Sequence, residues 1–321
     1  MYHVRLDTGA GYGNTGLRSA QCPMRTPYRF SLGRCSALTR LPAGPIPCRL
    51  LPMEKVVPIG FRWLGVAGVE LAVGGEVLAI DPYFTRFPLR RLWPGRVRPN
   101  ARLVAQMLPR CDVVLVSHPH FDHLMDVPEV VRNTGALAVG SDHTCRLLLA
   151  AGIPPVRIRR VTAGDRLSLG RFDVEVLPAE HITLAGRPML VGPLPADLRP
   201  PFRATDYRMD CCFSFLIRTG GRRLLFWACE RPGPAPEADV LFAGVFHSAE
   251  GYRSLLAQVR PQTVVPVHWD DFFRPLTKPV RPTRLPSIRR LDVEGLRRQI
   301  AAAAPGVEVV VPEMFREYEI V

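Results

Sequence analysis

The sequence contains almost no lysine. Of its 42 basic residues, only Lys55 and Lys278 are not arginine. The 33 prolines are roughly twice the usual 5% share, so part of the arginine excess is attributed to a compositional bias of the genome. The formal net charge of +13 permits an anionic partner, but the chain has no lysine- and arginine-rich segment of the nuclear-targeting kind. The charge alone therefore identifies no partner.

Several signals of other protein classes are also missing. No run of about 18 apolar residues occurs, so no membrane-spanning helix is expected. The eight cysteines are too sparse for a disulfide scaffold and include no C-x-x-C pair, which favours a reducing cytoplasm. No G-x-S-x-G motif occurs, so a serine nucleophile of that kind is excluded. With 47% apolar and 22% charged residues, the composition is that of a globular protein.

Residues 1–52 differ from the rest of the chain. They hold seven arginines but only one acidic residue, Asp7, and their apolar residues follow neither strand nor helix spacing. No secretory signal is recognisable. The composition, rich in arginine and poor in acidic residues, faintly resembles that of a transit peptide. Met53 is followed at once by a strand pattern. We therefore expect 1–52 to be a disordered or wrongly assigned leader and 53–321 to form one domain.

From residue 56 onward, the hydrophobic pattern is rich in strands first and mixed later. The predicted strands cover 61–66, 69–73, 76–80, 112–117, 156–161, 172–178, 211–218, 222–228, 239–243, 263–267 and 307–311. The predicted helices lie near 126–133, 143–151, 249–259 and 292–303. This succession suits an α+β fold in which two sheets pack together with helices outside.

The segment SHPHFDH, residues 117–123, carries the strongest chemical signal and directly follows a buried strand. In extended chain, His118 and His120 point to the same side, so both imidazoles can bind one metal ion. Asp122 and His123 come where the chain turns toward the next helix, and they can face a second ion. Histidine and aspartate together suit zinc, with iron or manganese as alternatives.

Two more histidines stand where predicted strands end. His181 follows the strand 172–178, and His268 follows the strand 263–267. Each alone would be read as a structural histidine, but beside the 117–123 segment each is a candidate ligand. Asp270 and Asp271, close behind His268, are either partners of a ligand or hydrated loop residues.

The H-x-H-x-D-H pattern after a buried strand, with the distal His181 and the final His268 in PVHWDDF, resembles the metallo-β-lactamase-fold hydrolases. The opening FRWLGVAGVELAV…VLAIDPYF resembles the branch that includes ascorbate-6-phosphate lactonase. The resemblance covers about residues 58–312. It implies a four-layer αββα sandwich with the site at one edge of the two sheets.

The resemblance also implies two groups of metal ligands. The first comprises His118, His120 and His181. The second comprises Asp122, His123 and His268. Asp81, after the third strand, matches a family aspartate that supports the metal-binding loop through hydrogen bonds. Two divalent metal ions, zinc before iron or manganese, are therefore the expected cofactors.

One position departs from the family pattern. The family usually has Gly-Asp after a strand, and this aspartate bridges the two metals, whereas here the strand runs into Cys229-Glu230. Glu230 stands at the aspartate position and is one methylene longer, so it is expected to bridge. Cys229 is the alternative, because a thiolate also binds zinc. In a third alternative neither residue binds, and the site holds one metal.

This ligand set predicts hydrolysis of an ester, a lactone or a phosphodiester. Two metals about 3.5–4 Å apart make a shared water reactive at neutral pH, and Asp122 is expected to orient the nucleophile or accept its proton. The insertion 182–210 follows His181, so its guanidinium groups are candidates to bind a small anionic substrate, or else are solvated. The candidate substrate residues are Arg187, Arg203, Tyr207 and Arg208.

Two other functions compete with this prediction. A nuclease would fit the net charge, but residues 53–321 carry only +7, from 35 basic and 28 acidic residues, which argues against nucleic acid as a partner. A one-metal redox enzyme or an inactive metal-binding protein would fit Cys229-Glu230. Flavodiiron-type chemistry is disfavoured, because the flavodiiron relatives of this fold have a glutamate at the position of Phe121. No pattern indicates an oligomeric state.

Overall fold

The computed structural model of the chain describes residues 57–91, 95–184, 187–227, 234–245, 249–283 and 293–320. The predicted leader, 1–52, lies outside the described residues. The division of the chain at residue 52 therefore stays a prediction.

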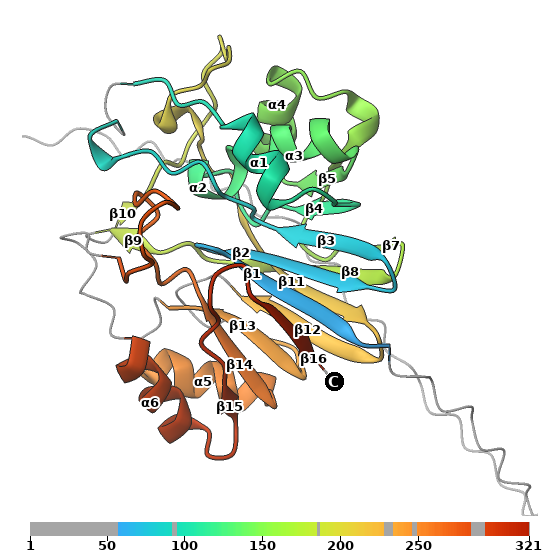
Figure 1. Ribbon diagram of the computed structural model, residues 1–321, viewed down its shortest axis with the longest axis vertical. Coiled ribbons are helices and arrows are strands. Elements are labelled where there is room, and N and C mark those ends of the chain that lie inside the picture. Colours follow the sequence, from blue (N-terminus) through green and yellow to red (C-terminus); the bar gives the residue numbers. More distant parts are fainter. Residues whose placement is uncertain are drawn as a thin grey trace, which may run out of the picture. The chain divides into compact units, whose positions relative to one another are not determined.

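The first of two large sheets has seven strands, in the order β16-β1-β2-β3-β4-β5-β6 (Figure 1). Its strands are β1 (Ile59–Gly65), β2 (Gly68–Val73), β3 (Glu76–Ile80), β4 (Val113–Leu115), β5 (Leu137–Gly140), β6 (Ile158–Arg160) and β16 (Glu317–Ile320). Strands β1, β2 and β3 pair antiparallel, while β3, β4, β5 and β6 run parallel. The carboxyl ends of β3 and β4 therefore meet at one edge of the sheet.

The second sheet also has seven strands, in the order β15-β14-β13-β12-β11-β8-β7. Its strands are β7 (Arg166–Leu169), β8 (Phe172–Ala179), β11 (Cys212–Thr219), β12 (Arg222–Trp227), β13 (Val240–Gly244), β14 (Thr263–Val267) and β15 (Glu308–Val309). Strand β11 is antiparallel to both β8 and β12, and β12, β13 and β14 are parallel. The carboxyl ends of β8 and β14 therefore lie at the same edge. A separate two-stranded sheet pairs β9 (Thr183–Leu184) with β10 (Arg187–Pro188).

Helices cover the outer faces of both large sheets (Figure 1). The helices are α1 (Ala101–Met107), α2 (Phe121–Leu124), α3 (Val127–Thr134), α4 (Asp142–Ala150), α5 (Ala249–Val259) and α6 (Val293–Ala303). One apolar cluster joins the first sheet to α1, α3 and α4, and another fills the space between the sheets and reaches α5 and α6. The predicted αββα sandwich is confirmed.

Strand β4 shows why the apolar runs of the sequence become central strands. Val113 and Leu115 belong to the core between the sheets, whereas Val114 faces the helices on the other side. Side chains alternate along a strand, so a strand covered on both faces must be apolar throughout. This burial fixes the position of the loop that follows β4.

Local sequence sets the ends of the helices around that loop. The side chain of Asn100 accepts the main-chain N–H of Leu103 at the start of α1, and Ser141 accepts that of Thr144 at the start of α4. Helix α3 ends at Gly135, whose φ of 76° suits glycine. These caps hold the helices that pack behind the site.

No helix within the described ranges combines the length and the apolar character needed to cross a membrane. The described cysteines, Cys111, Cys145, Cys211 and Cys212, are free thiols. The cytoplasmic location stays a prediction.

Candidate metal centre

Six of the predicted ligands lie where strands of both sheets end. His118 follows β4, His181 follows β8, and His268 directly follows β14. His120 precedes the short helix α2, which carries Asp122 and His123. Segments distant in sequence therefore bring these side chains to one edge of the sandwich.

The donor atoms of these side chains form two groups, and within each group they all lie within 4.8 Å of one another. The first triad consists of His118, His120 and His181. The second triad consists of Asp122, His123 and His268. The grouping is the one that the family resemblance implied.

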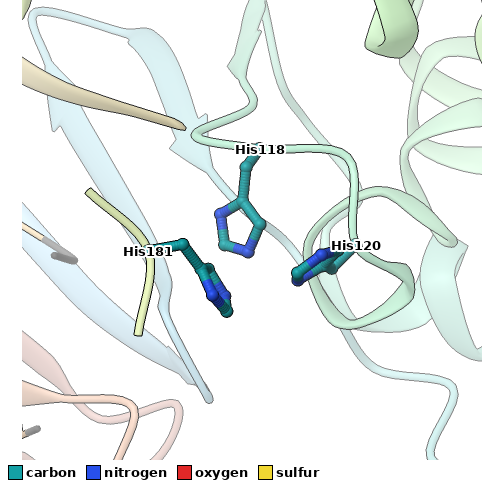
Figure 2. A group of neighbouring side chains, drawn as sticks. All are labelled: His118, His120 and His181. Carbon is teal, nitrogen blue, oxygen red and sulfur yellow. The ribbon is translucent and has the colours of Figure 1, made fainter. Parts of the chain in front are cut away.

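The three imidazoles of the first triad converge on a common space (Figure 2). Their ring centroids are 4.6–4.7 Å apart. His118 and His120 are buried, and His181 is half-buried. The Nε2 atoms of His118 and His120 are buried and have no hydrogen-bond partner among the described residues. Burying a ring nitrogen without a hydrogen-bond partner or a bound ion has a free-energy cost.

For His118 and His181, neighbouring groups fix which nitrogen of the ring carries the proton. The Nδ1 atom of His181 lies 2.9 Å from the carbonyl oxygen of Ile182, so it donates there and leaves the lone pair on Nε2. The hydroxyl of Ser117 donates to Asp81, so its oxygen accepts from Nδ1 of His118 at 3.0 Å. Both rings therefore present an unprotonated Nε2, which is the form that binds metals.

Asp81 is buried at the end of β3 and supports the loop between the two triads. Its carboxylate accepts the main-chain N–H of Ser117 at 2.7 Å and the Nδ1–H of His123 at 2.8 Å, besides the Ser117 hydroxyl. These are contacts of the kind implied for Asp81 by the family resemblance.

The second triad centres on the carboxylate of Asp122. Its Oδ2 atom lies 3.5 Å from Nε2 of His123 and 3.5 Å from Nε2 of His268. His268 has a φ of 63°, a left-handed conformation that few non-glycine residues adopt. The conformation of this histidine therefore needs support from its surroundings.

The electrostatics of the two triads differ. Burial lowers the pKa of His120 to about 3 and that of His181 to about 4, and it holds the pKa of His118 well below its ordinary value. Burial also opposes a charge on His123, but the charges of Asp122 and Asp81 raise its pKa. The first triad is thus a set of neutral rings, and the second favours a positive charge.

Comparison with known proteins places this chain in a family. A family model described as a beta-lactamase superfamily domain matches residues 77–228. A UPF0173 metal-dependent hydrolase of Anaeromyxobacter dehalogenans strain 2CP-C is 33% identical over 235 residues, which cover 65% of this chain and 74% of the relative. The chain belongs to the metal-dependent hydrolases of the metallo-β-lactamase superfamily.

Other relatives agree with this assignment. A UPF0173 metal-dependent hydrolase of Pyrobaculum arsenaticum is 29% identical over 217 residues, covering 66% of this hydrolase and 84% of the relative. The metallo-β-lactamase-fold protein YhfI of Bacillus subtilis is similar in structure, with a TM-score of 0.51 at 13% identity, over 82% of this chain and 99% of that one. The predicted superfamily and hydrolase class are confirmed, while the lactonase branch stays a prediction.

Part of the predicted site lies outside the described residues of the hydrolase. Cys229 and Glu230 are among these positions, so the expected bridging ligand stays a prediction. The side chain of Arg187 also lies outside the description.

The structure shows protein contacts for two of the other predicted substrate residues. Tyr207 is buried in the core of the helical side, with its ring 5.6 Å from that of Phe202. The guanidinium of Arg208 donates to the carbonyl oxygens of Thr205 and Pro193, at 3.3 and 3.1 Å. Arg203 is exposed. Contact of these residues with a substrate stays a prediction.

The sequence left the role of Asp270 open, and the structure of the hydrolase buries it completely in an ion pair with Arg86. Sequence reasoning did not single out Asp126. Its carboxylate accepts the main-chain N–H groups of Phe84 and Thr85, at 2.6 and 2.7 Å, and burial raises its pKa to about 6. An aspartate in a loop gives no sign in the sequence of such distant partners.

Proposed function

We propose that the hydrolase holds one divalent metal ion in each triad, with zinc as the preferred metal. The observation that carries the proposal is the buried pair of Nε2 atoms on His118 and His120, which have no partner among the described residues. Both rings are neutral over the physiological pH range, so their lone pairs are available. Imidazole and carboxylate donors suit zinc, and also iron or manganese.

The second triad fits a cation for a different reason. In the absence of a metal, the carboxylates of Asp122 and Asp81 keep a positive charge favourable on His123. A divalent ion would supply that charge instead. Glu230 is proposed to bridge the two ions, as its position after β12 suggests.

The chemistry follows from this ligand set. When bound, the ions lower the pKa of a water molecule toward ~7 and polarise a carbonyl or phosphoryl oxygen. Asp122 is proposed to accept a hydrogen bond from the attacking water and to orient it. Burial opposes ionisation of Asp122, but the charge of His123 and a hydrogen bond from His268 hold its pKa below the ordinary value, so it is a carboxylate.

For the substrate, we propose a small anionic ester, lactone or phosphodiester. Arg203 is exposed on the segment that follows His181, which leaves its guanidinium accessible to a carboxylate or a phosphate. Arg187 and Arg208 belong to the same segment.

The test is the metal content of the full chain, purified without chelator and measured by elemental analysis. We expect about two equivalents per chain. The variants His118→Ala and His268→Ala should each lose one of them. His143→Ala is a matched control, because this half-buried histidine bonds the carbonyl of Arg208 and lies outside both triads.

Two results would contradict the proposal. A wild-type chain that binds no metal even after reconstitution would leave the fold without this chemistry. A single equivalent, lost in His118→Ala but kept in His268→Ala, would favour a one-metal enzyme.

A further inference from the structure

The turn between β1 and β2 is joined to the residue after β14 by an unusual backbone contact. The main-chain N–H of His268 donates to the carbonyl oxygen of Val66 at 2.6 Å. Both residues have positive φ angles, 63° for His268 and 50° for Val66. A β-branched residue such as valine adopts this region only under constraint from its surroundings.

The constraint comes from a buried carboxylate. Oδ1 of Asp270 accepts the main-chain N–H of Val66 at 2.8 Å, so Asp270 binds the N–H and His268 binds the carbonyl oxygen of the same residue. Oδ2 of Asp270 pairs with Nη1 of Arg86 at 2.7 Å. The side chains of Arg86 and Asp270 are only 3% and 0% exposed.

Burying the ion pair between Arg86 and Asp270 has a free-energy cost. Burying two charges carries a desolvation penalty that their attraction often only balances. The Nε and Nη2 donors of Arg86 have no hydrogen-bond partner among the described residues, which adds to that penalty. The net contribution of such an ion pair to fold stability is therefore small, and its specific contact is the hydrogen bond from Val66 to Asp270.

Aromatic packing also holds the same loop. Trp269 stacks on Trp63 with a centroid distance of 4.8 Å, and Nε1 of Trp63 donates to the carbonyl oxygen of Val66 at 3.0 Å. The carbonyl that accepts from His268 and the residue that follows His268 are therefore both held by Trp63. The Nε2 atom of His268 is left 3.5 Å from Oδ2 of Asp122.

We propose that Asp270 and Arg86 are positioning residues that act on His268 through Val66. Arg86 fixes the carboxylate of Asp270, which fixes the peptide N–H of Val66. The Val66 carbonyl then holds the main chain of His268 in its left-handed conformation. This inference rests on the proposed function, in which His268 belongs to a metal-binding triad.

The test compares stepwise zinc affinities of full-length variants by competition with a chromophoric chelator. We expect Asp270→Ala to weaken one of the two binding steps at least about tenfold and to leave the other unchanged. Asp270→Asn should have a smaller effect on that step, because an amide oxygen can still accept from Val66. His268→Ala identifies the step, since it removes the ligand itself.

Asp271→Asn is the matched control. Asp271 is the next residue and pairs with Arg281 at 2.7 Å, but its side chain has no described contact with Val66. Its two zinc affinities should equal those of the wild type. Thermal unfolding with chelator present reports whether each metal-free variant still folds.

Three outcomes would overturn the inference. The first is wild-type affinity at both steps in Asp270→Ala, or in Asp270→Asn if the alanine variant does not fold. The second is equal weakening of both steps, which a general loss of structure would produce. The third is an Asp271→Asn variant as defective as Asp270→Asn. By contrast, two normal steps in His268→Ala would contradict the proposed function itself, and the positioning role would fall with it.

Discussion

The two triads are supported in different ways. In the first triad the contacts that orient His118 and His181 come from the adjacent residues, Ser117 and Ile182. In the second triad the support comes from far along the chain. Asp81, which binds Nδ1 of His123, lies 42 residues before it in the sequence. Asp270, which accepts the main-chain N–H of Val66, lies 204 residues after Val66. His118 and His181 therefore take their closest orienting contacts from neighbouring residues, whereas His123 and the main chain of His268 take theirs from residues distant in sequence.

One short segment joins both long-range supports. It begins at Asp81, which holds His123, and ends at Arg86, which pairs with Asp270. In its middle, the main-chain N–H groups of Phe84 and Thr85 donate to Asp126. Changes in this segment should therefore act on the second triad more than on the first, except where a residue touches both.

Asp81 is that exception, and its loss should have the largest effect. Asp81→Ala leaves the Ser117 N–H, the Ser117 hydroxyl and the His123 Nδ1–H without their acceptor. We expect a loss of about 3 kcal/mol in the free energy of unfolding and weaker metal binding at both triads. Urea unfolding and metal content measure the two effects.

Asp112→Ala provides the control for Asp81. This exposed residue accepts the main-chain N–H of Val77 at 2.8 Å, at the opposite end of β4. Its loss should cost about 1 kcal/mol and leave metal binding unchanged. If metal binding fell equally in both variants, Asp81 would have no special relation to the site.

Asp126 should give the next largest effect, as a dependence of stability on pH. Burial raises its pKa to about 6 in the folded chain, above the ordinary value of about 3.9 for an unfolded aspartate. The folded chain binds the proton of Asp126 more tightly than the unfolded chain does. The contribution of Asp126 to the free energy of unfolding is therefore full at low pH and is lost as the pH rises through about 6. In Asp126→Asn the side-chain oxygen can still accept both N–H groups, but it does not titrate.

The difference in unfolding free energy, wild type minus Asp126→Asn, should therefore fall by about 2 kcal/mol between pH 4 and pH 7. Urea unfolding of both proteins at a series of pH values measures it. A difference that stays constant with pH would show that Asp126 does not titrate in this range.

The contrast between local and distant supports also explains what the sequence could predict. The H-x-H-x-D-H segment and the strand-end positions of His181 and His268 are visible as local patterns, and the central strands are visible as apolar runs. Support from distant residues has no local signature. Asp126, in LMDVPE, and Asp270, in HWDDFF, lie at or beside the ends of predicted elements, where a hydrated carboxylate is the ordinary expectation.

The elements missed by sequence reasoning follow the same rule. Strand β5, Leu137–Gly140, is short and carries no alternation, and it is a strand because it pairs in parallel with β4 and β6. Strand β16, Glu317–Ile320, is equally short and pairs with β1 from the opposite end of the described chain. Tertiary pairing decides both.

Gly65 offers a test of this comparison with the smallest expected effect. It lies at φ 91°, and a methyl group there would overlap Nη2 of Arg86 and come within 2.8 Å of Cε of Met314. Gly75, in the turn between β2 and β3, has the same φ of 91° but open space around the added carbon. Gly65→Ala and Gly75→Ala therefore share the backbone strain, and they differ in whether the substitution disturbs Arg86.

We expect Gly75→Ala to cost about 1 kcal/mol of unfolding free energy through strain alone and to leave metal binding unchanged. Gly65→Ala should cost about 1 kcal/mol more, because Arg86 must shift, and should weaken only the metal-binding step that His268→Ala removes. Chelator competition and urea unfolding on the two variants measure the contrast. If both weakened metal binding alike, strain in the first sheet would be the cause, and the segment from Asp81 to Arg86 would not link the β1–β2 turn to the second triad.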